Sequence, residues 1–186
     1  MKYLIYTTLM LLSLSIQADE LSQTYSKHVD RQGNITFPTD FLMDGFVHLG
    51  SNTVANPETG EIFNLNSSYT QKAALVSYQK TGEWPDGTLI VKILKFVSGK
   101  KSLLSGQVQH QTSQDIAFVM VKDTENRFQH SSNKAIWGNG WGWAQFTDVK
   151  QPTVNTNQDK NYCQGCHLPR KQTDWLYTDI YPQMQR

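Results

Sequence analysis

The stretch from Thr88 to Val97 limits the possible folds more than any other part of the chain. Its residues, Thr-Leu-Ile-Val-Lys-Ile-Leu-Lys-Phe-Val, are mostly apolar and several are β-branched. Such a run favours a central strand of a sheet. The turn-forming residues Pro85-Asp86-Gly87 precede it, and Ser98-Gly99-Lys100-Lys101, which we expect to be a second turn, follow it. We therefore expect a fold built around a β-sheet.

The segments around this strand predict more strands than helices. Tyr69, Ala73, Val76 and Lys80 fall at helical spacing, which predicts a helix over residues 68–80 that ends at Gly82. A short helical segment is expected near the C-terminus. The predicted fold class is therefore α+β, a mostly antiparallel sheet with one or two packed helices and a C-terminal attachment segment. The other expected strands cover residues 46–49 within a β-like region 34–54, and residues 103–112, 116–123 and 141–147.

The N-terminus has the layout of a secretory signal peptide. A positive start is followed by a mostly apolar run over residues 3–16 and then by Gln17-Ala18, directly before two acidic residues. We expect cleavage after Ala18, so residues 1–18 would be removed and the protein would be periplasmic. A membrane anchor is the alternative, but the run is short for a span. Residues 19–33 are polar and expected to be loose, and residues 34–186 are expected to form the folded domain.

Length and charge exclude several classes of protein. The 186 residues suit one domain or two very small ones, and 17 Lys+Arg against 16 Asp+Glu give a net charge of +1. This balance provides no electrostatic footprint for nucleic acid or for an anionic membrane surface. The hydrophobic share of 38% argues against an integral membrane protein, and no second apolar stretch could span a bilayer.

The clearest chemical signal is the sequence Cys163-Gln164-Gly165-Cys166-His167, a C-x-x-C-H motif that contains both cysteines of the chain. Two thiols one helical turn apart can add to the two vinyl groups of one haem, and the adjacent histidine then lies beneath the iron as its ligand. The motif therefore predicts one covalently attached haem c, with His167 on the metal. A disulfide remains possible, but it does not explain the histidine. A zinc site would need more ligands, and a redox motif would need a βαβ context.

The ligand on the other face of the haem distinguishes an electron carrier from an open site, because a carrier usually has a second Met or His ligand. In predicted strands the side chains of His48, His110 and Met120 are more simply explained as packed or surface groups. The full set of candidates is Met43, His48, His110, Met120, His130 and Met184.

Around the motif, the chain resembles the cytochrome P-460 family, which includes the β-fold cytochromes c-prime. The order of the matching stretches around a C-terminal C-x-x-C-H is specific, although each stretch is weak alone. The most distinctive runs from Lys80 to Lys92. The other matching stretches are residues 34–38, 46–50, 118–123, 141–144, 171–175 and 181–182.

The resemblance implies one c-type haem with an open distal site, often in a homodimer. It also implies that Lys92 is bonded to the haem macrocycle, as in the cytochromes P-460 proper. Lys92 shares a strand face with Ile90 and Leu94, which favours an inward side chain, although an outward, solvated lysine is the alternative. We expect Trp141, Trp143 and Phe146 to wall the pocket, with core packing as the alternative reading.

The family's activity suggests oxidation of hydroxylamine or a related nitrogen oxide, with electrons passing to a soluble redox partner such as another cytochrome. That reaction needs a proton acceptor, for which Asp159 is one candidate and Glu125 another, although each is more simply explained as a solvated loop acid. Residues 61–65 lack the arginine that some family members have there. The alternatives are therefore a nitric-oxide-binding protein without turnover and, with weaker support, an electron-transfer cytochrome.

Overall fold

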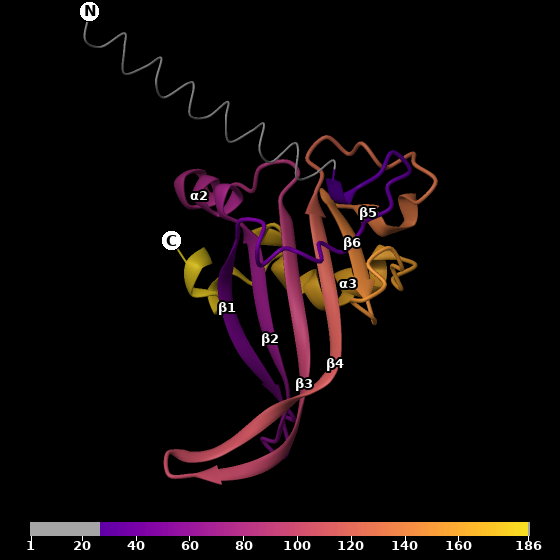
Figure 1. Cartoon of the computed structure of the whole chain (residues 1–186). Helices are drawn as coiled ribbons and strands as arrows, with labels where there is room; N and C mark the ends of the chain where they lie inside the picture. The colour runs from indigo at the N-terminus through magenta and orange to yellow at the C-terminus, as the bar shows by residue number, and fades with distance from the viewer. Residues whose placement is uncertain (1–26, 186) are drawn as a thin grey trace, which may run out of the picture.

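The computed structural model describes residues 27–185, and its centre is one six-stranded antiparallel sheet (Figure 1). The predicted signal peptide and residues 19–26 of the segment expected to be loose lie outside the described residues. The spatial order of the strands is β1-β2-β3-β4-β6-β5. The strands are β1 Phe46–Ala55, β2 Ile62–Gln71, β3 Leu89–Leu103, β4 Gly106–Lys122, β5 Trp137–Gly138 and β6 Trp141–Phe146.

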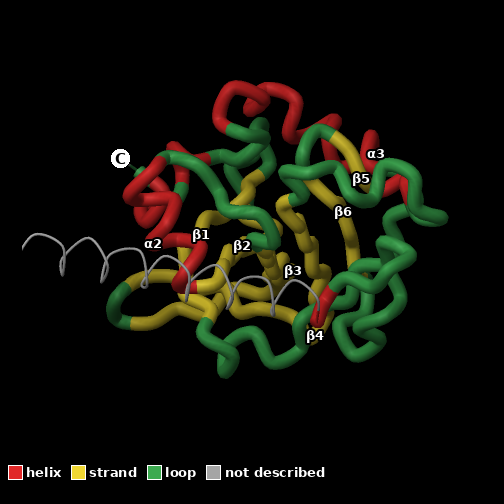
Figure 2. The backbone as a smooth tube through the Cα atoms, turned by 90° about the horizontal axis from the view of Figure 1, so that it is seen from above, coloured by secondary structure: helices red, strands yellow, loops and turns green. Residues whose placement is uncertain are grey.

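In the described part of the chain, two α-helices and four short 3-10 helices accompany the sheet, and most of them lie on one side of its curved surface (Figure 2). The predicted α+β class is thus confirmed. No helix within residues 27–185 is long and apolar enough to cross a membrane. The helices are α2 Lys72–Thr81, α3 Lys160–His167, η1 Lys134–Ile136, η2 Leu168–Thr173, η3 Thr178–Ile180 and η4 Pro182–Met184.

Strand β3 is central because both of its faces are covered. Leu89 and Val91 point into one apolar cluster, which the N-terminal segment closes with Val29, Ile35 and other side chains. Ile90 points into a second cluster on the opposite face. Helix α2 and residues 168–185, which we call the C-terminal tail, complete this cluster. This alternation follows from the two-residue period of a strand. The functional chemistry described below lies on the second face.

The predicted turn at Ser98–Lys101 is wrong, because the strand continues through it to Leu103. A register shift between Ser98 and Lys101, with Gly99 at a φ of 65°, accommodates these turn-forming residues as an irregularity within the ladder. The turn lies instead at residues 104–105. The two strands expected at 103–112 and 116–123 are consequently one strand, β4.

The predicted helix starts later than expected, since Ser68 to Gln71 end strand β2. Ser68 and Thr70 are buried on the sheet, and the Thr70 hydroxyl donates a hydrogen bond of 2.7 Å to the Leu89 carbonyl. Tertiary packing therefore overrides the helical spacing over these residues. The predicted end is confirmed: Gly82 caps α2 in the left-handed conformation, with a φ of 86°.

Strands β3 and β4 extend past the rest of the sheet as a two-stranded arm (Figure 1). The pairing of β3 with β2 ends at Phe96, and that of β4 with β6 begins at Ala117. We call residues 97–111 the arm. Leu103, Leu104 and Val108 near its tip are exposed, so the arm presents apolar side chains to solvent.

Candidate haem site

A cavity of about 590 Å³ lies on the face of the sheet that carries α3 and the C-terminal tail. This volume falls within the range of cofactor and ligand sites. Its wall is mostly apolar, with contributions from every strand except β5. The lining residues are Asn52, Val54, Asn66, Ser68, Ile90, Lys92, Phe118, Val119, Met120, Trp143, Ala144, Tyr162, Cys163, Cys166, His167, Leu176, Tyr177, Ile180, Tyr181 and Met184.

Helix α3 presents Cys163, Cys166 and His167 to this cavity. Both cysteines are free thiols, so the structure contains no disulfide between them. Gln164, on another side of the helix, is buried: its amide donates to the Gly138 carbonyl at 3.3 Å and accepts from the Asn139 amide at 3.1 Å. These two bonds fix the rotation of the short helix, and so direct the motif toward the cavity.

The His167 ring is held on three sides. Its Nδ1–H donates a hydrogen bond of 2.6 Å to the Trp175 carbonyl. The rings of Trp143 and Tyr177 approach it edge-on, with centroids at 5.2 and 5.5 Å. Burial lowers the pKa of His167, although the bond to Trp175 opposes that effect. The ring is therefore a neutral imidazole in one tautomer, and Nε2 remains available as a metal ligand.

The two thiols differ in their surroundings. Burial raises the pKa of Cys163 to about 11, and only the nearby Lys92 ammonium opposes this rise. Cys166 is exposed, and its carbonyl accepts a hydrogen bond of 2.5 Å from the Tyr177 hydroxyl. At neutral pH Cys163 is therefore a thiol rather than a thiolate.

Lys92 extends into the cavity from the first third of β3. It lies between Ser68 on β2 and Phe118 on β4, and its Nζ is 4.6 Å from the centre of the Phe118 ring. Burial lowers the pKa of Lys92, an effect that Cys166 and Cys163 partly oppose. The inward orientation predicted from strand alternation is the one that the structure shows.

The aromatic residues expected at the pocket divide into three positions. Trp143 lines the cavity, whereas Trp141 is fully buried in the core beside it, with its Nε1 bonded to Asp174. The prediction for Phe146 is wrong: this side chain packs against Phe37 on the opposite face. Side chains of β6 alternate between the two faces of the sheet. Phe146 is two residues after Ala144, so both side chains belong to the apolar cluster on the face opposite Trp143.

The two acids considered as proton acceptors lie away from the cavity lining. Asp159 is the N-cap of α3, where its carboxylate accepts a hydrogen bond of 2.8 Å from the Asn161 backbone. Glu125 is exposed and pairs with Arg127 at 3.1 Å. Among the residues that line the cavity, none is Asp or Glu.

Two of the candidate second ligands, Met120 and Met184, line the cavity, and both are buried. Met43 is 91% exposed, and His48 donates to or accepts from Ser51 at 2.8 Å on the surface. His130 is also exposed. The side chain of His110 lies outside the described part of the chain.

Polar residues from β1 and β2 were not identified from the sequence as part of the site. The Ser68 hydroxyl donates a hydrogen bond of 2.9 Å to the Tyr181 hydroxyl. The side-chain amide of Asn66 donates one of 3.2 Å from Nδ2 to Oδ1 of Asn52. On β2, the buried polar residues occupy alternate positions from Asn64 to Thr70. That alternation was the available signal for a polar strip facing the cavity.

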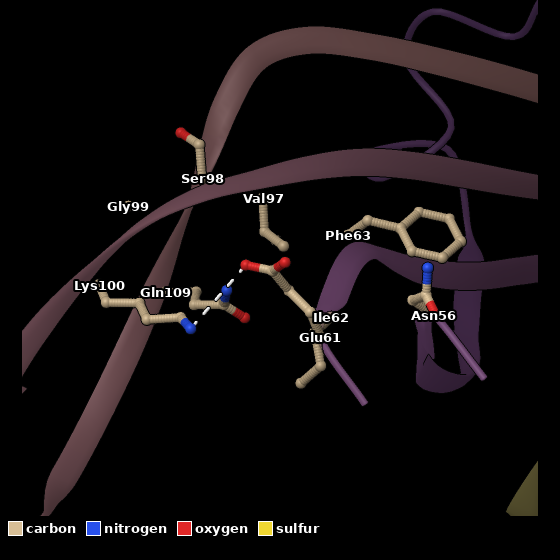
Figure 3. A pocket seen from close by; sticks show the side chains of 9 residues that line it. All are labelled: Asn56, Glu61, Ile62, Phe63, Val97, Ser98, Gly99, Lys100 and Gln109. Atoms are coloured by element: carbon tan, nitrogen blue, oxygen red, sulfur yellow. Dashed lines mark ion pairs between the residues drawn. The ribbon is translucent and has the colours of Figure 1, made fainter. Parts of the chain in front are cut away.

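A second cavity, of about 600 Å³, lies at the base of the arm and is more open (Figure 3). Its mouth contains an exposed ion pair between Lys100 and Glu61 at 3.8 Å. Its lining contains no cysteine or histidine, whereas Cys163, Cys166 and His167 line the first cavity. The second is lined by Asn56, Glu61, Ile62, Phe63, Val97, Ser98, Gly99, Lys100 and Gln109.

The first cavity fits a haem. Two thiols, a neutral imidazole with a free Nε2 and an apolar wall all meet there. Within residues 27–185, no group of three or more His, Cys, Asp and Glu side chains could hold a bare metal ion. Fold and site together define a haem-binding cytochrome with an α+β fold.

Comparison with known proteins identifies the family. The family model for cytochrome P460 matches residues 47–178, a span that includes the central strands, the C-x-x-C-H helix and Trp175. The chain belongs to the cytochrome P460 family and is a haem cytochrome of that family. A search of curated proteins finds none that matches the chain.

Proposed function

We propose that this protein carries one haem c and oxidises hydroxylamine or a related nitrogen oxide at an open haem site. The observation that carries the proposal is the meeting of Lys92, Cys163, Cys166 and His167 in one cavity. These residues come from two elements that are far apart in the sequence. A lysine in an apolar cavity is costly unless its amine is neutral or used chemically. The resemblance to the cytochromes P-460 supplies such a use, a bond to the haem macrocycle.

Each residue has a distinct role in this proposal. The thiols of Cys163 and Cys166 would hold the haem by adding across its two vinyl groups, so that each sulfur would bond to carbon and its hydrogen would move to the vinyl group. His167 would hold the iron through Nε2, while its Nδ1–H donates to the Trp175 carbonyl. A bound haem would supply the site for the nitrogen ligand and the path for its electrons. Trp143 and Phe118 line the cavity with aromatic rings and would limit the access of water to the bound haem.

The test is the absorption spectrum of the reduced holoprotein, with Lys92→Ala and Lys92→Arg beside the wild type. We expect a strongly red-shifted Soret band in the wild type that both variants lose, because neither retains the lysine amine. A denaturing gel stained for haem separates covalent from non-covalent haem, and Cys163→Ala and Cys166→Ala serve there as controls. Ordinary high-spin c-type spectra in all three proteins would refute the bond to Lys92.

The second candidate function is nitric oxide binding without turnover. The observation that favours it is the lack of a carboxylate among the cavity-lining residues, since hydroxylamine oxidation must release protons. No arginine is present at residues 61–65 either. Steady consumption of hydroxylamine by the holoprotein with an electron acceptor would exclude this candidate, whereas nitric oxide binding without such consumption would establish it.

An electron-transfer role has one supporting observation, the presence of Met120 and Met184 in the cavity lining. Either sulfur would serve as a sixth ligand if it reached the iron. Met120→Leu and Met184→Leu test this role. A low-spin spectrum that becomes high-spin in one of these variants would support it, and a high-spin spectrum in the wild type would exclude it.

We further propose that the mature protein begins after Ala18, resides in the periplasm and passes electrons to a soluble redox partner such as another cytochrome. The layout of residues 1–18 supports the first two points. N-terminal sequencing of protein from the periplasmic fraction tests them. An intact Met1 in that fraction would contradict cleavage.

We also propose a homodimer in which each arm packs against the second cavity of the other copy. The arm extends roughly 20 Å beyond the sheet and ends in the exposed Leu103 and Leu104. The cavity at its base offers the half-exposed Phe63 as an apolar contact and Glu61 as a partner for the basic Lys101. One copy thus contains both halves of the contact, which a two-fold interface requires.

A further inference from the structure

Two consecutive residues beside the haem site have left-handed backbone conformations. Asp174 has a φ of 54° and Trp175 a φ of 65°. Neither residue is glycine, and the conformation is especially uncommon for a bulky aromatic residue. Such a pair persists only where the surrounding structure holds it. The second residue of the pair supplies the carbonyl that accepts from His167 Nδ1.

An ion pair from a distant strand holds the first residue. Lys122, near the end of β4, is 9% exposed, and its Nζ lies 2.8 and 2.7 Å from the two carboxylate oxygens of Asp174. The same Nζ lies 4.7 Å from the centre of the Trp141 ring. Trp141 Nε1 donates to both the carboxylate and the carbonyl of Asp174, each at 3.1 Å. Asp174 is therefore fixed through its side chain and its backbone.

Further contacts hold the loop that contains the pair. The Trp175 backbone N–H donates to the Arg170 carbonyl at 2.7 Å, and the Thr173 hydroxyl donates to the Leu176 carbonyl at 2.6 Å. The Trp175 ring is buried against Trp143, which in turn contacts the His167 ring. A continuous path of contacts thus connects Lys122 with His167, although these two residues do not hydrogen-bond each other.

We propose that Lys122 and Asp174 are positioning residues for the haem ligand. They hold the left-handed pair so that the Trp175 carbonyl accepts from His167 Nδ1, and they thereby set how strongly His167 donates electrons to the iron. The inference rests on the proposed role of His167 as the axial ligand. A hydrogen bond at Nδ1 makes the ring a stronger donor and fixes its tautomer and orientation. Stronger donation stabilises ferric over ferrous haem.

The test uses the holoprotein with Lys122→Met, Lys122→Arg and Asp174→Asn. We measure the ferric–ferrous equilibrium by spectroelectrochemical titration and the iron–histidine stretching band by resonance Raman spectroscopy. Lys122→Met should shift the equilibrium toward ferrous haem by about tenfold and lower the stretching frequency. Asp174→Asn should shift both in the same direction by less, because asparagine tolerates the left-handed conformation and keeps one acceptor. Lys122→Arg should leave both the ferric–ferrous equilibrium and the stretching frequency at their wild-type values, since arginine retains the positive charge.

The matched control is Lys95→Met, which removes the partner of Asp115 in another partly buried ion pair of the sheet. Both haem readouts should stay at wild-type values in this control. If Lys122→Met and Asp174→Asn fold with lowered thermal stability but with unchanged haem readouts, the ion pair is only structural and the inference is wrong.

Failure of the haem binding on which the proposed function depends would give a different result, a chain that binds no haem. The tautomer of His167 in that chain, measured by nitrogen-15 NMR, would still test the inference. The wild type should be protonated at Nδ1, and Lys122→Met should give a mixture of tautomers. Equal tautomer populations in the two proteins would overturn the proposal.

Discussion

At the scale of single residues, burial changes the pKa values of the side chains that line the haem site. His167 is a neutral imidazole because burial lowers its pKa and the Trp175 carbonyl selects one tautomer. Lys92 has a lowered pKa for the same reason of burial, which favours a neutral amine in the cavity. The protonation states of both side chains thus depend on their burial in the folded chain. The same effect occurs outside the haem site, at His28.

His28 should make the stability of the protein depend on pH. Its side chain is 6% exposed, and its Nε2 has no hydrogen-bond partner within residues 27–185. Burial lowers the pKa of His28; the charge of Lys27 lowers this pKa further, and that of Asp44 raises it. As the pH falls below about 6.5, the unfolded chain takes up a proton at His28 before the folded chain does. The unfolding free energy should therefore fall by up to about 1.4 kcal/mol per pH unit.

Denaturant unfolding of the wild type and of His28→Gln between pH 8 and pH 5 measures this dependence. In this range the unfolding free energy of His28→Gln should depend less steeply on pH than that of the wild type, by up to about 1.4 kcal/mol per pH unit, because glutamine does not titrate. Identical slopes in the two proteins would show that His28 binds its proton equally in both states.

At the scale of elements, the short helix α3 determines the position of the motif. Eight residues form a marginal helix, because few of its backbone hydrogen bonds are internal. Asp159 caps its first turn, and Gln164 attaches its buried side to the β5–β6 connection. The helix is thus held by one capping side chain and by packing rather than by its own propensity.

Asp159 should therefore matter as a helix cap. Asp159→Ala should lower the unfolding free energy by about 0.5–2 kcal/mol, because it leaves the Asn161 N–H without an acceptor. Asp159→Ser should keep both the stability and any hydroxylamine turnover, since serine is an equally good N-cap. Thermal unfolding and turnover assays measure the two effects. Turnover lost in Asp159→Ser at unchanged stability would instead establish the carboxylate as a proton acceptor.

At the scale of the whole molecule, the arm is the feature that the monomer does not explain. Its strands pair with each other beyond the sheet, and its tip exposes Leu104 fully. Apolar side chains grouped at the end of a projecting hairpin mark an interaction site. The cavity at the base of the arm (Figure 3) lies on the same molecule. In the proposed dimer, two copies would therefore cover both surfaces at once.

We expect the wild type to form the proposed dimer and the triple variant Leu103→Ser, Leu104→Ser, Val108→Ser to be a monomer, because the variant removes the apolar surface of the arm. Size-exclusion chromatography with light scattering gives the mass of each. The exposed Leu42, outside the arm, provides the matched control, and Leu42→Ser should leave the dimer intact. A wild type that is monomeric at high concentration, or a triple variant that remains dimeric, would contradict the proposal.

The sequence by itself determined the features that depend on local chemistry. The β-branched run at Thr88–Val97 predicted the central strand, Gly82 predicted the end of α2, and strand alternation predicted that Lys92 points inward. The C-x-x-C-H motif predicted haem binding because its residue types and spacing leave few other chemical uses. The family match agrees with that reading.

Only the tertiary structure decided the features that depend on packing between distant segments. Ser68 to Gln71 became strand because the sheet buries them, and the bulge at Gly99 extended β3 into the arm. Asp159 proved to be a helix cap that lies outside the cavity lining. The pairing of Lys122 with Asp174 joins β4 to the C-terminal tail, and neither spacing nor composition encodes such a contact. Which polar groups meet in a folded chain depends on how its elements pack, and local sequence does not specify that.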